Sequence, residues 1–393
     1  MIKKLLLGVA LVLGLAVTAF LLLAPAAVER GLNPVTMPGE GWPVSAEAQA
    51  LHDRLVIGDW HSDALLWNRN LLNRARQGHT DIPRLQEGNM ALQVFTTVTR
   101  SPRGQNYDHN DTEAGDNITP LFIAQLRPVR AWFSLRERAL VQAEALHRAA
   151  RRDPDRLRVI QTRDDLARLL EDRAAGATVM GGLLGSEGGH PLEGDLANLD
   201  VLHAAGFRLM GLTHFFDNEL GGSLHGEGGS GAGLSDFGRQ VVDAMMDRGM
   251  VIDVTHASPQ MVRDVLQIPG TRPVLSHTGI HGHCPSPRNL PDDLVRDIAA
   301  AGGMIGIGFW SDVVCGRTPD DVAQAIVAAI ALVGDDHVSL GSDWDGSVDT
   351  PFDAAHLAAL TQALMDRGLS EDRIAKVMGG NMMAYLMETL PEG

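Results

Sequence analysis

The sequence predicts a parallel (β/α)8 barrel of the TIM type, an α/β fold in which helices surround a closed eight-stranded sheet. Short β-branched or apolar runs recur along the chain, and amphipathic helical patterns separate most of them. Six of these runs end in His, Asp or Glu, at the face where barrels carry their chemistry. The expected strands are residues 55–58, 91–98, 178–184, 208–212, 250–254, 273–275, 304–309 and 337–340.

The composition fits one large ordered chain and excludes several classes of protein. The 393 residues are 45% hydrophobic and 21% charged, which excludes an intrinsically disordered chain. A formal net charge of −16 is the opposite of the basic surface that a nucleic-acid-binding protein needs, so no nucleic-acid partner is expected. The two cysteines, Cys284 and Cys315, are too few for a disulfide scaffold or a thiolate zinc site.

The N-terminus is predicted to be a targeting segment. Lys3 and Lys4 precede 24 uncharged residues, 5–28, which would span about 36 Å as a helix against about 30 Å for a membrane's hydrocarbon core. Because lysines before such a run place that end in the cytoplasm, we expect an exported, periplasmic or extracytoplasmic protein anchored to the cytoplasmic membrane. An uncleaved anchor is favoured, and a small-x-small pattern at 24–26 leaves signal-peptide cleavage open.

The chain is therefore divided into three parts. Residues 1–28 are the predicted signal anchor or signal peptide, residues 29–45 a tether that contains proline and glycine, and residues 46–393 a single barrel domain. The polar span 100–158, whose second half has a helical pattern, is predicted to be an insertion between the second and third strands. Ser370, followed by two acidic residues, is predicted to cap the C-terminal helix.

The residues at the strand ends have the spacing of a metal site. The two-residue period of a strand points His61 and Asp63 to the same side, where they can chelate one ion. His256 and His277 follow neighbouring strands and can share a second ion, and the two oxygens of Glu187 can bridge both. Imidazole and carboxylate without thiolate suit zinc, with manganese or cobalt as substitutes. Two ions about 3.5–4 Å apart can hold a bridging hydroxide and polarise a carbonyl together.

Ten motifs, taken together, point to one protein family. In chain order they are His61-Ser-Asp63, Thr80-Asp-Ile-Pro-Arg-Leu, Gly185-Ser-Glu187-Gly-Gly-His, Leu212-Thr-His214, Gly233-Leu-Ser-Asp-Phe-Gly, Ile252-Asp-Val-Thr-His256, Leu275-Ser-His277, Arg288-Asn-Leu-Pro-Asp-Asp with Gly341-Ser-Asp343-Trp-Asp-Gly, and Gly379-Gly-Asn381. This series resembles the membrane dipeptidases, the renal-dipeptidase type of zinc peptidase (family M19), from about Ser45 to Met387. Ser62 stands where Asn is more usual, and Trp344 stands where Phe or Tyr is typical.

The resemblance implies two Zn²⁺ per chain. It assigns His61 and Asp63 to one zinc, His256 and His277 to the other, and Glu187 to the bridge between them. This assignment agrees with the one that the strand-end spacing suggests.

The resemblance also implies three residues that handle the substrate: His214, Arg288 and Asp343. The guanidinium of Arg288 suits the free α-carboxylate of a dipeptide. His214 can donate a hydrogen bond to the oxyanion of the tetrahedral intermediate. Asp343 can take the proton of the bridging water and pass it to the leaving amine. Its alternative role is to orient a ligand histidine.

The predicted function is a dinuclear zinc dipeptidase that uses a metal-bridging hydroxide. The family resemblance further implies tolerance of D-residues at the C-terminal position and a homodimer. One alternative is another dinuclear barrel amidohydrolase, a deacylase or lactonase. Many of those bridge their metals with a carboxylated lysine, whereas Lys3, Lys4 and Lys376 all lie away from the predicted strand ends. The other alternative is a non-catalytic membrane-tethered binding protein, but no expected ligand is missing from the sequence.

Five further residues carry smaller predictions. Cys284 and Cys315 follow adjacent strands, so their loops share the catalytic face, and an oxidising compartment would preserve a disulfide between them. Two free thiols are the alternative, because loop positions alone do not guarantee the required Cα separation. His281 and His283 are predicted to line the pocket as loop residues, and His190 to lie behind Glu187 as its partner.

Overall fold

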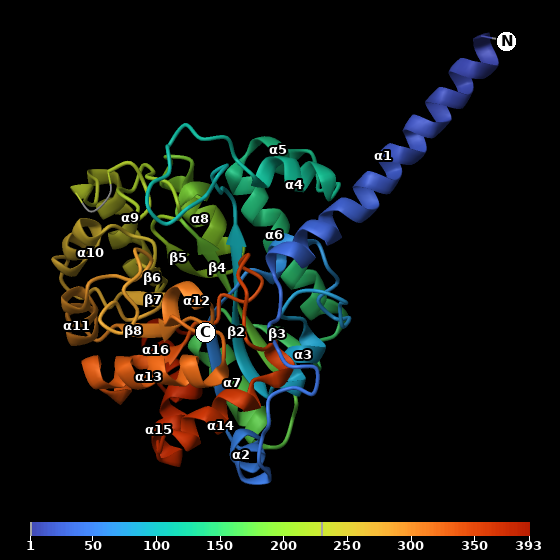
Figure 1. Cartoon of the computed structure of the whole chain (residues 1–393). Helices are drawn as coiled ribbons and strands as arrows, with labels where there is room; N and C mark the ends of the chain where they lie inside the picture. The colour runs from blue at the N-terminus through green and yellow to red at the C-terminus, as the bar shows by residue number, and fades with distance from the viewer. Residues whose placement is uncertain (1, 229–230) are drawn as a thin grey trace.

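Eight parallel strands close into a barrel in the computed structural model, which describes residues 2–228 and 231–393. The order around the ring is β1, β2, β4, β5, β6, β7, β8 and β9, and β9 pairs again with β1. The strands are β1 Ile57–Ser62, β2 Met90–Val98, β4 Met180–Glu187, β5 Phe207–Gly211, β6 Val251–Asp253, β7 Val274–Thr278, β8 Met304–Ile307 and β9 Val338–Leu340. The predicted TIM-type fold is confirmed (Figure 1).

The predicted insertion after β2 is also present, together with a strand that the sequence pattern does not reveal. Its helices are α4 Ile118–Ala124, α5 Arg130–Phe133 and α6 Leu135–Arg152. β3 Leu157–Val159 follows them and pairs with the first three residues of β4, whereas β5 pairs with β4 from Leu184 onward. Three residues are too few to show a strand period, so only the pairing with β4 reveals β3.

The remaining helices surround the barrel. They are α2 Ala46–His52, α3 Ile82–Glu87, α7 Arg163–Ala174, α8 Ala197–Ala204, α9 Asp236–Asp247, α10 Pro259–Leu266, α11 Asp292–Ala300, α12 Ser311–Val314, α13 Pro319–Val333, α14 Ala358–Asp366, α15 Glu371–Ala375 and α16 Asn381–Thr389. Short turns of helix are η1 Ala64–Trp67, η2 His190–Leu192, η4 Asp335–His337, η5 Ala354–His356 and η6 Lys376–Gly380. Side-chain caps fix several starts: Thr318 caps α13, and Ser370 caps α15 as predicted.

The N-terminal helix α1, Ile2–Leu32, projects away from the barrel over most of its length (Figure 1). Within the described part of the chain, no helix combines the length and the apolar character needed to cross a membrane. The predicted membrane span at 5–28 is therefore not supported.

The end of α1 and the segment after it pack against the barrel, although the composition predicts a tether at 29–45. Glu29 and Asn33 are buried, and Val35 forms a parallel bridge with Thr350. The indole Nε1 of Trp42 donates to the carbonyl of Pro351 at 2.8 Å. These contacts join the segment to the loop that follows β9, which is the loop that carries Asp343.

Candidate metal centre

Seven buried acidic or histidine side chains gather at the carboxyl ends of the strands. They come from β1 or the residues just after it, from β4, from the loops after β5 and β6, from β7 and from the loop after β9: His61, Asp63, Glu187, His214, His256, His277 and Asp343. β1, β4 and β7 extend three or four residues further than the apolar runs predict. His61, Glu187 and His277 therefore lie on the strands themselves, where backbone pairing holds them rigidly.

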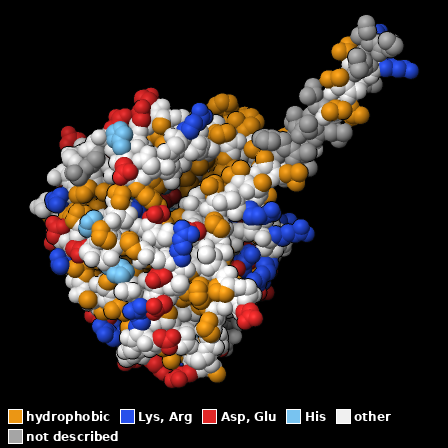
Figure 2. Space-filling model, in the orientation of Figure 1, with side chains coloured by type: hydrophobic (Ala, Val, Ile, Leu, Met, Phe, Trp, Pro, Cys, Tyr) orange, Lys and Arg blue, Asp and Glu red, His pale blue; other side chains and the backbone are white. Residues whose placement is uncertain are grey.

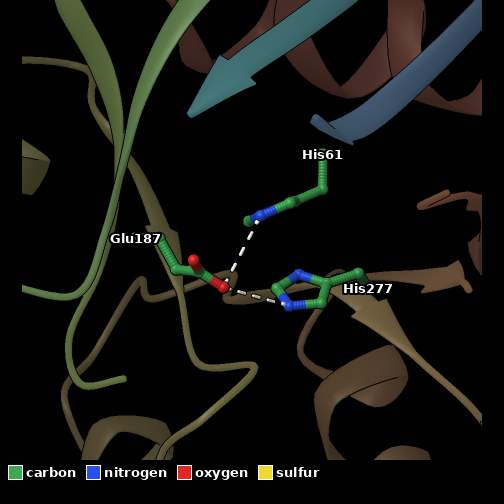
Figure 3. Close-up of side chains that lie close together, drawn as sticks. All are labelled: His61, Glu187 and His277. Carbon is green, nitrogen blue, oxygen red and sulfur yellow. Dashed lines mark ion pairs between the residues drawn. The ribbon is translucent and has the colours of Figure 1, made fainter. Parts of the chain in front are cut away.

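The carboxylate of Glu187 is the centre of this cluster. Its Oε1 lies 3.1 Å from His256 Nε2, 3.4 Å from His277 Nε2 and 3.6 Å from His61 Nε2. Figure 3 shows His61 and His277 approaching this oxygen from different strands. The residues predicted for the two ions therefore meet at one carboxylate, which is the place that the bridging role requires.

The ligand-type atoms form three overlapping groups, each within 4.8 Å. They are His61 with Glu187 and His277, Glu187 with His214 and His256, and His61 with Asp63 and Asp343. All five predicted metal ligands belong to these groups. The groups also take in His214 and Asp343, and they pair His277 with His61 rather than with His256. The two imidazoles of His256 and His277 nevertheless lie close, with 3.1 Å between their Nε2 atoms.

Hydrogen bonds behind the cluster orient its members. The hydroxyl of Ser276 donates to Asp253 Oδ2 at 2.6 Å and lies 2.8 Å from His277 Nδ1. Because that hydroxyl proton is already used, His277 Nδ1 donates to it, and the lone pair of His277 Nε2 points toward Glu187. On the other side of the cluster, the hydroxyl of Thr96 donates to Asp63 Oδ1 at 2.6 Å.

The charges of the cluster fit a divalent cation. Asp63, Glu187 and Asp343 are each at most 7% exposed and lie within a few ångströms of one another. Burial and the nearby Asp63 carboxylate raise the pKa of Glu187 well above its usual range, and burial raises the pKa of Asp343 to about 8. Burial also lowers the pKa of His256, so its imidazole is neutral. A cation would offset the repulsion between the carboxylates, and neutral imidazoles are the form that binds metal.

Arg288 lies beside the cluster, in the loop after β7. It is 1% exposed, its Nη2 donates to the carbonyl of His277 at 2.9 Å, and it lines the same cavity as Glu187 and Asp343. A buried guanidinium next to an open cavity is suited to binding an anionic group of a ligand. This is the position predicted for it.

His214 has a more specific protonation state than the sequence predicts. Its Nδ1 lies 3.1 Å from the carbonyl oxygen of Arg100, which can only accept, so Nδ1 carries the proton. Its Nε2 faces Glu187 Oε2 at 3.3 Å as an acceptor, and burial lowers the pKa of His214 to about 4. Donation from Nε2 to an oxyanion therefore requires the imidazolium form of His214.

Asp343 lies in a loop with an unusual backbone. Asp343, Asp345 and Ser347 have φ values of 58°, 66° and 66°, in the left-handed region that non-glycine residues rarely adopt. The carboxylate of Asp345 accepts from the backbone N–H of His79 at 2.7 Å and pairs with Arg69 at 2.5 Å. These contacts hold the loop in a conformation that would otherwise be costly.

Two of the smaller predictions are wrong. His281 is exposed, His283 is half-buried, and neither belongs to the described residues that line the cavity. His190 is buried, but its ring nitrogens have no hydrogen-bond partner among the described residues, so it does not hold Glu187 through a hydrogen bond. The disulfide between Cys284 and Cys315 is confirmed, with a Cα–Cα distance of 5.4 Å.

Tyr107 is one of several cavity residues that no pattern in the sequence marks. It lies in the polar insertion after β2, and its hydroxyl accepts a hydrogen bond from Trp310 Nε1 at 3.1 Å. No strand end or motif marks it, because its place at the cavity depends entirely on how the insertion folds back over the barrel.

A family model places the chain among known proteins. The model of the membrane dipeptidases, peptidase family M19, matches residues 45–389. The chain belongs to this family. It is therefore a metallo-dipeptidase, a hydrolase that acts on peptide bonds.

Relatives in sequence and structure agree with the family. The dipeptidase aclJ of Aspergillus oryzae is 29% identical over 352 residues, with 85% of this chain and 78% of aclJ covered. The dipeptidase ataJ of Aspergillus terreus is 26% identical, with 88% of this chain and 87% of ataJ covered. Two solved structures share the fold. The probable dipeptidase PvdM of Pseudomonas aeruginosa has a TM-score of 0.71 and 20% identity, with 88% of this chain and 98% of PvdM covered. A metallopeptidase of Rhodobacter sphaeroides, solved with a phosphinate mimic of L-Ala-D-Ala, has a TM-score of 0.67 and 23% identity, with 86% of this chain and 99% of that chain covered.

Proposed function

We propose that the chain hydrolyses dipeptides at a dinuclear zinc centre, with His61 and Asp63 on one ion, His256 and His277 on the other, and Glu187 bridging. The observation that carries this proposal is the convergence of three imidazole nitrogens on one oxygen of Glu187. Bound zinc would supply Lewis acidity toward the scissile carbonyl and lower the pKa of a water molecule.

The other residues have roles in binding the substrate and moving protons. Arg288 binds the α-carboxylate of the C-terminal residue and so fixes the scissile bond over Glu187. Asp343, whose pKa burial raises to about 8, accepts the proton of the attacking water and returns it to the leaving amine. His214 is assigned a hydrogen bond to the carbonyl oxygen as negative charge develops there, and this role requires a proton on Nε2 that His214, with a pKa lowered to about 4, gains only during the reaction.

The proposal includes D-residues at the C-terminal position. It is supported by the Rhodobacter sphaeroides relative, which was solved with a mimic of L-Ala-D-Ala. Because Arg288 recognises a carboxylate rather than a side chain, the stereochemistry of the residue that bears it is weakly constrained by that contact.

We further propose that the protein acts outside the cytoplasm, with residues 1–28 as an uncleaved export segment. The support is the Lys3-Lys4 start before an uncharged run and the Cys284–Cys315 disulfide, which persists in an oxidising compartment. Fractionation of cells that express the full chain tests this location. The predicted homodimer stays a prediction.

The deciding experiment is metal analysis combined with a substrate panel. Purified full-length protein should hold two zinc ions per chain and hydrolyse L-Ala-L-Ala and L-Ala-D-Ala. N-acyl amino acids and lactones, which test the deacylase and lactonase alternatives, should not react. Less than one bound metal per chain with no dipeptide cleavage would contradict the proposal. A His256→Ala variant should lose both metal and activity.

A further inference from the structure

A second pocket lies beside the catalytic cavity. It measures about 240 Å³ and is lined by residues that follow β1, by Arg127 and by the C-terminal half of α6. The short helix η1 separates the two hollows, because Leu66 and Trp67 line the catalytic cavity, whereas Ala64 and Leu65 line the second pocket. Among the described residues the two linings have no member in common, so the second pocket is separate from the reacting groups.

Arginine dominates the lining of this pocket. Within the described chain no Asp or Glu lines it, whereas four arginines do: Arg69, Arg127, Arg148 and Arg152. Figure 2 shows Lys and Arg side chains gathered on the flank of the barrel below the base of α1, and the lining residue Arg69 pairs with Glu29 at the end of that helix. The charge of the pocket is therefore opposite to that of the whole chain, whose formal net charge is −16.

The two arginines of α6 have no counter-charge. Arg148 and Arg152 are exposed, and their four-residue spacing places them on the same face of the helix. The acids nearest to them in the sequence, Glu144 and Asp153, pair with other arginines. By contrast, Arg69 is neutralised by its partners on α1 and in the loop after β9.

Arg127 is the buried member of the group. It is 5% exposed, and only neutral groups accept from it: Nε donates to Gln125 Oε1 at 3.0 Å, and Nη2 donates to the carbonyl of Leu65 at 2.9 Å. Its Nη1 forms no hydrogen bond in the described part of the chain, so two N–H groups remain for the pocket. Burial and the charge of Arg148 lower the pKa of Arg127 to about 10, because a buried cation without a counter-charge is unfavourable.

We propose that this arginine pocket, formed by Arg127, Arg148 and Arg152, binds a phosphoryl group that carries two or more negative charges. A guanidinium binds phosphate oxygens in pairs. The three terminal oxygens of a phosphoryl dianion can accept from all three arginines, whereas a carboxylate offers one charge and two oxygens. Pockets for drug-sized ligands measure about 300–1,000 Å³, so the group bound in this smaller pocket is small. The inference does not rest on the proposed dipeptidase function.

Calorimetric titration of the full-length protein with inorganic phosphate and with pyrophosphate tests the inference. Both should bind, and pyrophosphate should bind more tightly because it carries more charge. Arg127→Gln should weaken binding by about 10–100-fold, because it removes a buried charged donor. Arg148→Gln should weaken it by about fivefold, because that guanidinium is exposed.

The matched control is Arg151→Gln. Arg151 is an exposed arginine of the same helix, but it does not line the pocket, so its replacement should leave the affinity unchanged. If Arg148→Gln and Arg151→Gln bind phosphate equally well, the anion is bound elsewhere, for example at the metal centre, and the inference is wrong. Failure of both anions to bind at millimolar concentrations would also overturn it. Because Arg148 is exposed, this comparison does not depend on whether Arg127→Gln folds.

Vesicles distinguish a lipid headgroup from a free phosphate as the source of the phosphoryl group. The probe is phosphatidic acid, a phosphomonoester, in phosphatidylcholine vesicles that sediment with bound protein. If the headgroup is the ligand, Arg148→Gln and added pyrophosphate should both reduce sedimentation, and Arg151→Gln should not. If the ligand is a free phosphate, Arg148→Gln and Arg151→Gln should sediment equally, while only Arg148→Gln loses affinity for phosphate in the titration.

Discussion

The two sides of the catalytic cavity are held by different kinds of interaction. On the Arg288 side, the Cys284–Cys315 disulfide joins the loop after β7 to the segment after α12. On the Asp343 side, no covalent link is present in the described chain, and residues 29–36 hold the loop after β9 instead. There Asn33 Oδ1 accepts from the backbone N–H of Ser347 at 2.8 Å, and Thr36 N–H donates to the carbonyl of Thr350 at 2.8 Å.

Both sides hold non-glycine residues with left-handed backbone. Cys315 has φ 57° on one side, and Asp343 has φ 58° on the other. Such conformations persist only where the surroundings over-determine them. The disulfide does this for Cys315 without regard to pH. For Asp343, two ion pairs hold the loop instead, one between Asp345 and Arg69 and one between Arg69 and Glu29. These ion pairs depend on the protonation of the carboxylates and on an intact N-terminal segment.

The Asp343 side of the cavity therefore depends on residues that precede the family domain. The 45–389 match contains Asp343 and Arg69 but not Glu29 or Asn33. A segment that looks like a tether in the sequence is therefore part of the support of the proposed proton-transfer residue.

The largest expected effect comes from removing the proton acceptor Asp343, on the side of the cavity that residues 29–36 hold in place. Asp343→Asn keeps the size and polarity of the side chain but cannot take a proton, so kcat should fall by about 10²–10⁴-fold. Metal content should stay at that of the unsubstituted protein. Loss of an ion from this variant would show that Asp343 is a metal ligand rather than the acid–base group.

Breaking the covalent support tests the other side. The cysteines are separated by 31 residues, and closing a loop of this length stabilises the folded state by about 3–4 kcal/mol in the chain-entropy model. The Cys284→Ser/Cys315→Ser double variant should unfold at a lower urea concentration, and its free energy of unfolding should be smaller by that amount. Reductant should destabilise the unsubstituted protein in the same way and leave the double variant unchanged. Equal midpoints for the two proteins would contradict a stabilising bridge.

Removing the anion-binding group should be nearly as severe. Arg288→Ala should lower kcat/KM by about 100-fold, mainly through KM, because the substrate carboxylate loses a buried partner. C-terminally amidated dipeptides should be poor substrates of the unsubstituted protein. The variant should no longer distinguish the acid from the amide. If the unsubstituted protein hydrolyses both equally well, Arg288 does not bind the carboxylate.

Weakening the ionic support should give a smaller, more selective effect. Arg69→Leu leaves Asp345 without its cation, so Asp343 should be misplaced and kcat should fall by about tenfold with little change in KM. Arg69→Lys should restore part of the activity. Arg54→Leu is the control, because Arg54 forms an exposed ion pair with Glu371 far from the site. An equal loss in the Arg54 and Arg69 variants would argue for a general effect on folding.

The smallest effect concerns pH. Burial outweighs the pairing with Arg69 and raises the pKa of Glu29 from 4.5 to about 7. The folded protein therefore holds this proton more tightly than the unfolded chain, and the associated stability, present below pH 4.5, is lost as the pH rises to about 7. Glu29→Gln should remove this part of the pH dependence of the urea midpoint. Parallel pH profiles for the two proteins would exclude a role for Glu29.

Local sequence patterns were enough to predict the barrel and the identity of the side chains at its centre. Strand periods and helix caps act over a few residues, so the strands and the cap at Ser370 were predictable from neighbouring residues alone. Parallel strands also bring their carboxyl ends to one face, and this rule alone places His61, Glu187 and His277 together.

Contacts between distant residues decided the rest. β3 forms only because its residues pair with β4. The tautomer of His214 depends on the carbonyl of Arg100, which lies 114 positions away in the chain. The packing of residues 29–36 against the loop after β9, and with it the apolar wall that α1 contributes to the cavity, leaves no periodic or compositional signal. These features depend on which surfaces come into contact when the barrel closes, and a local sequence pattern does not encode contacts between distant residues.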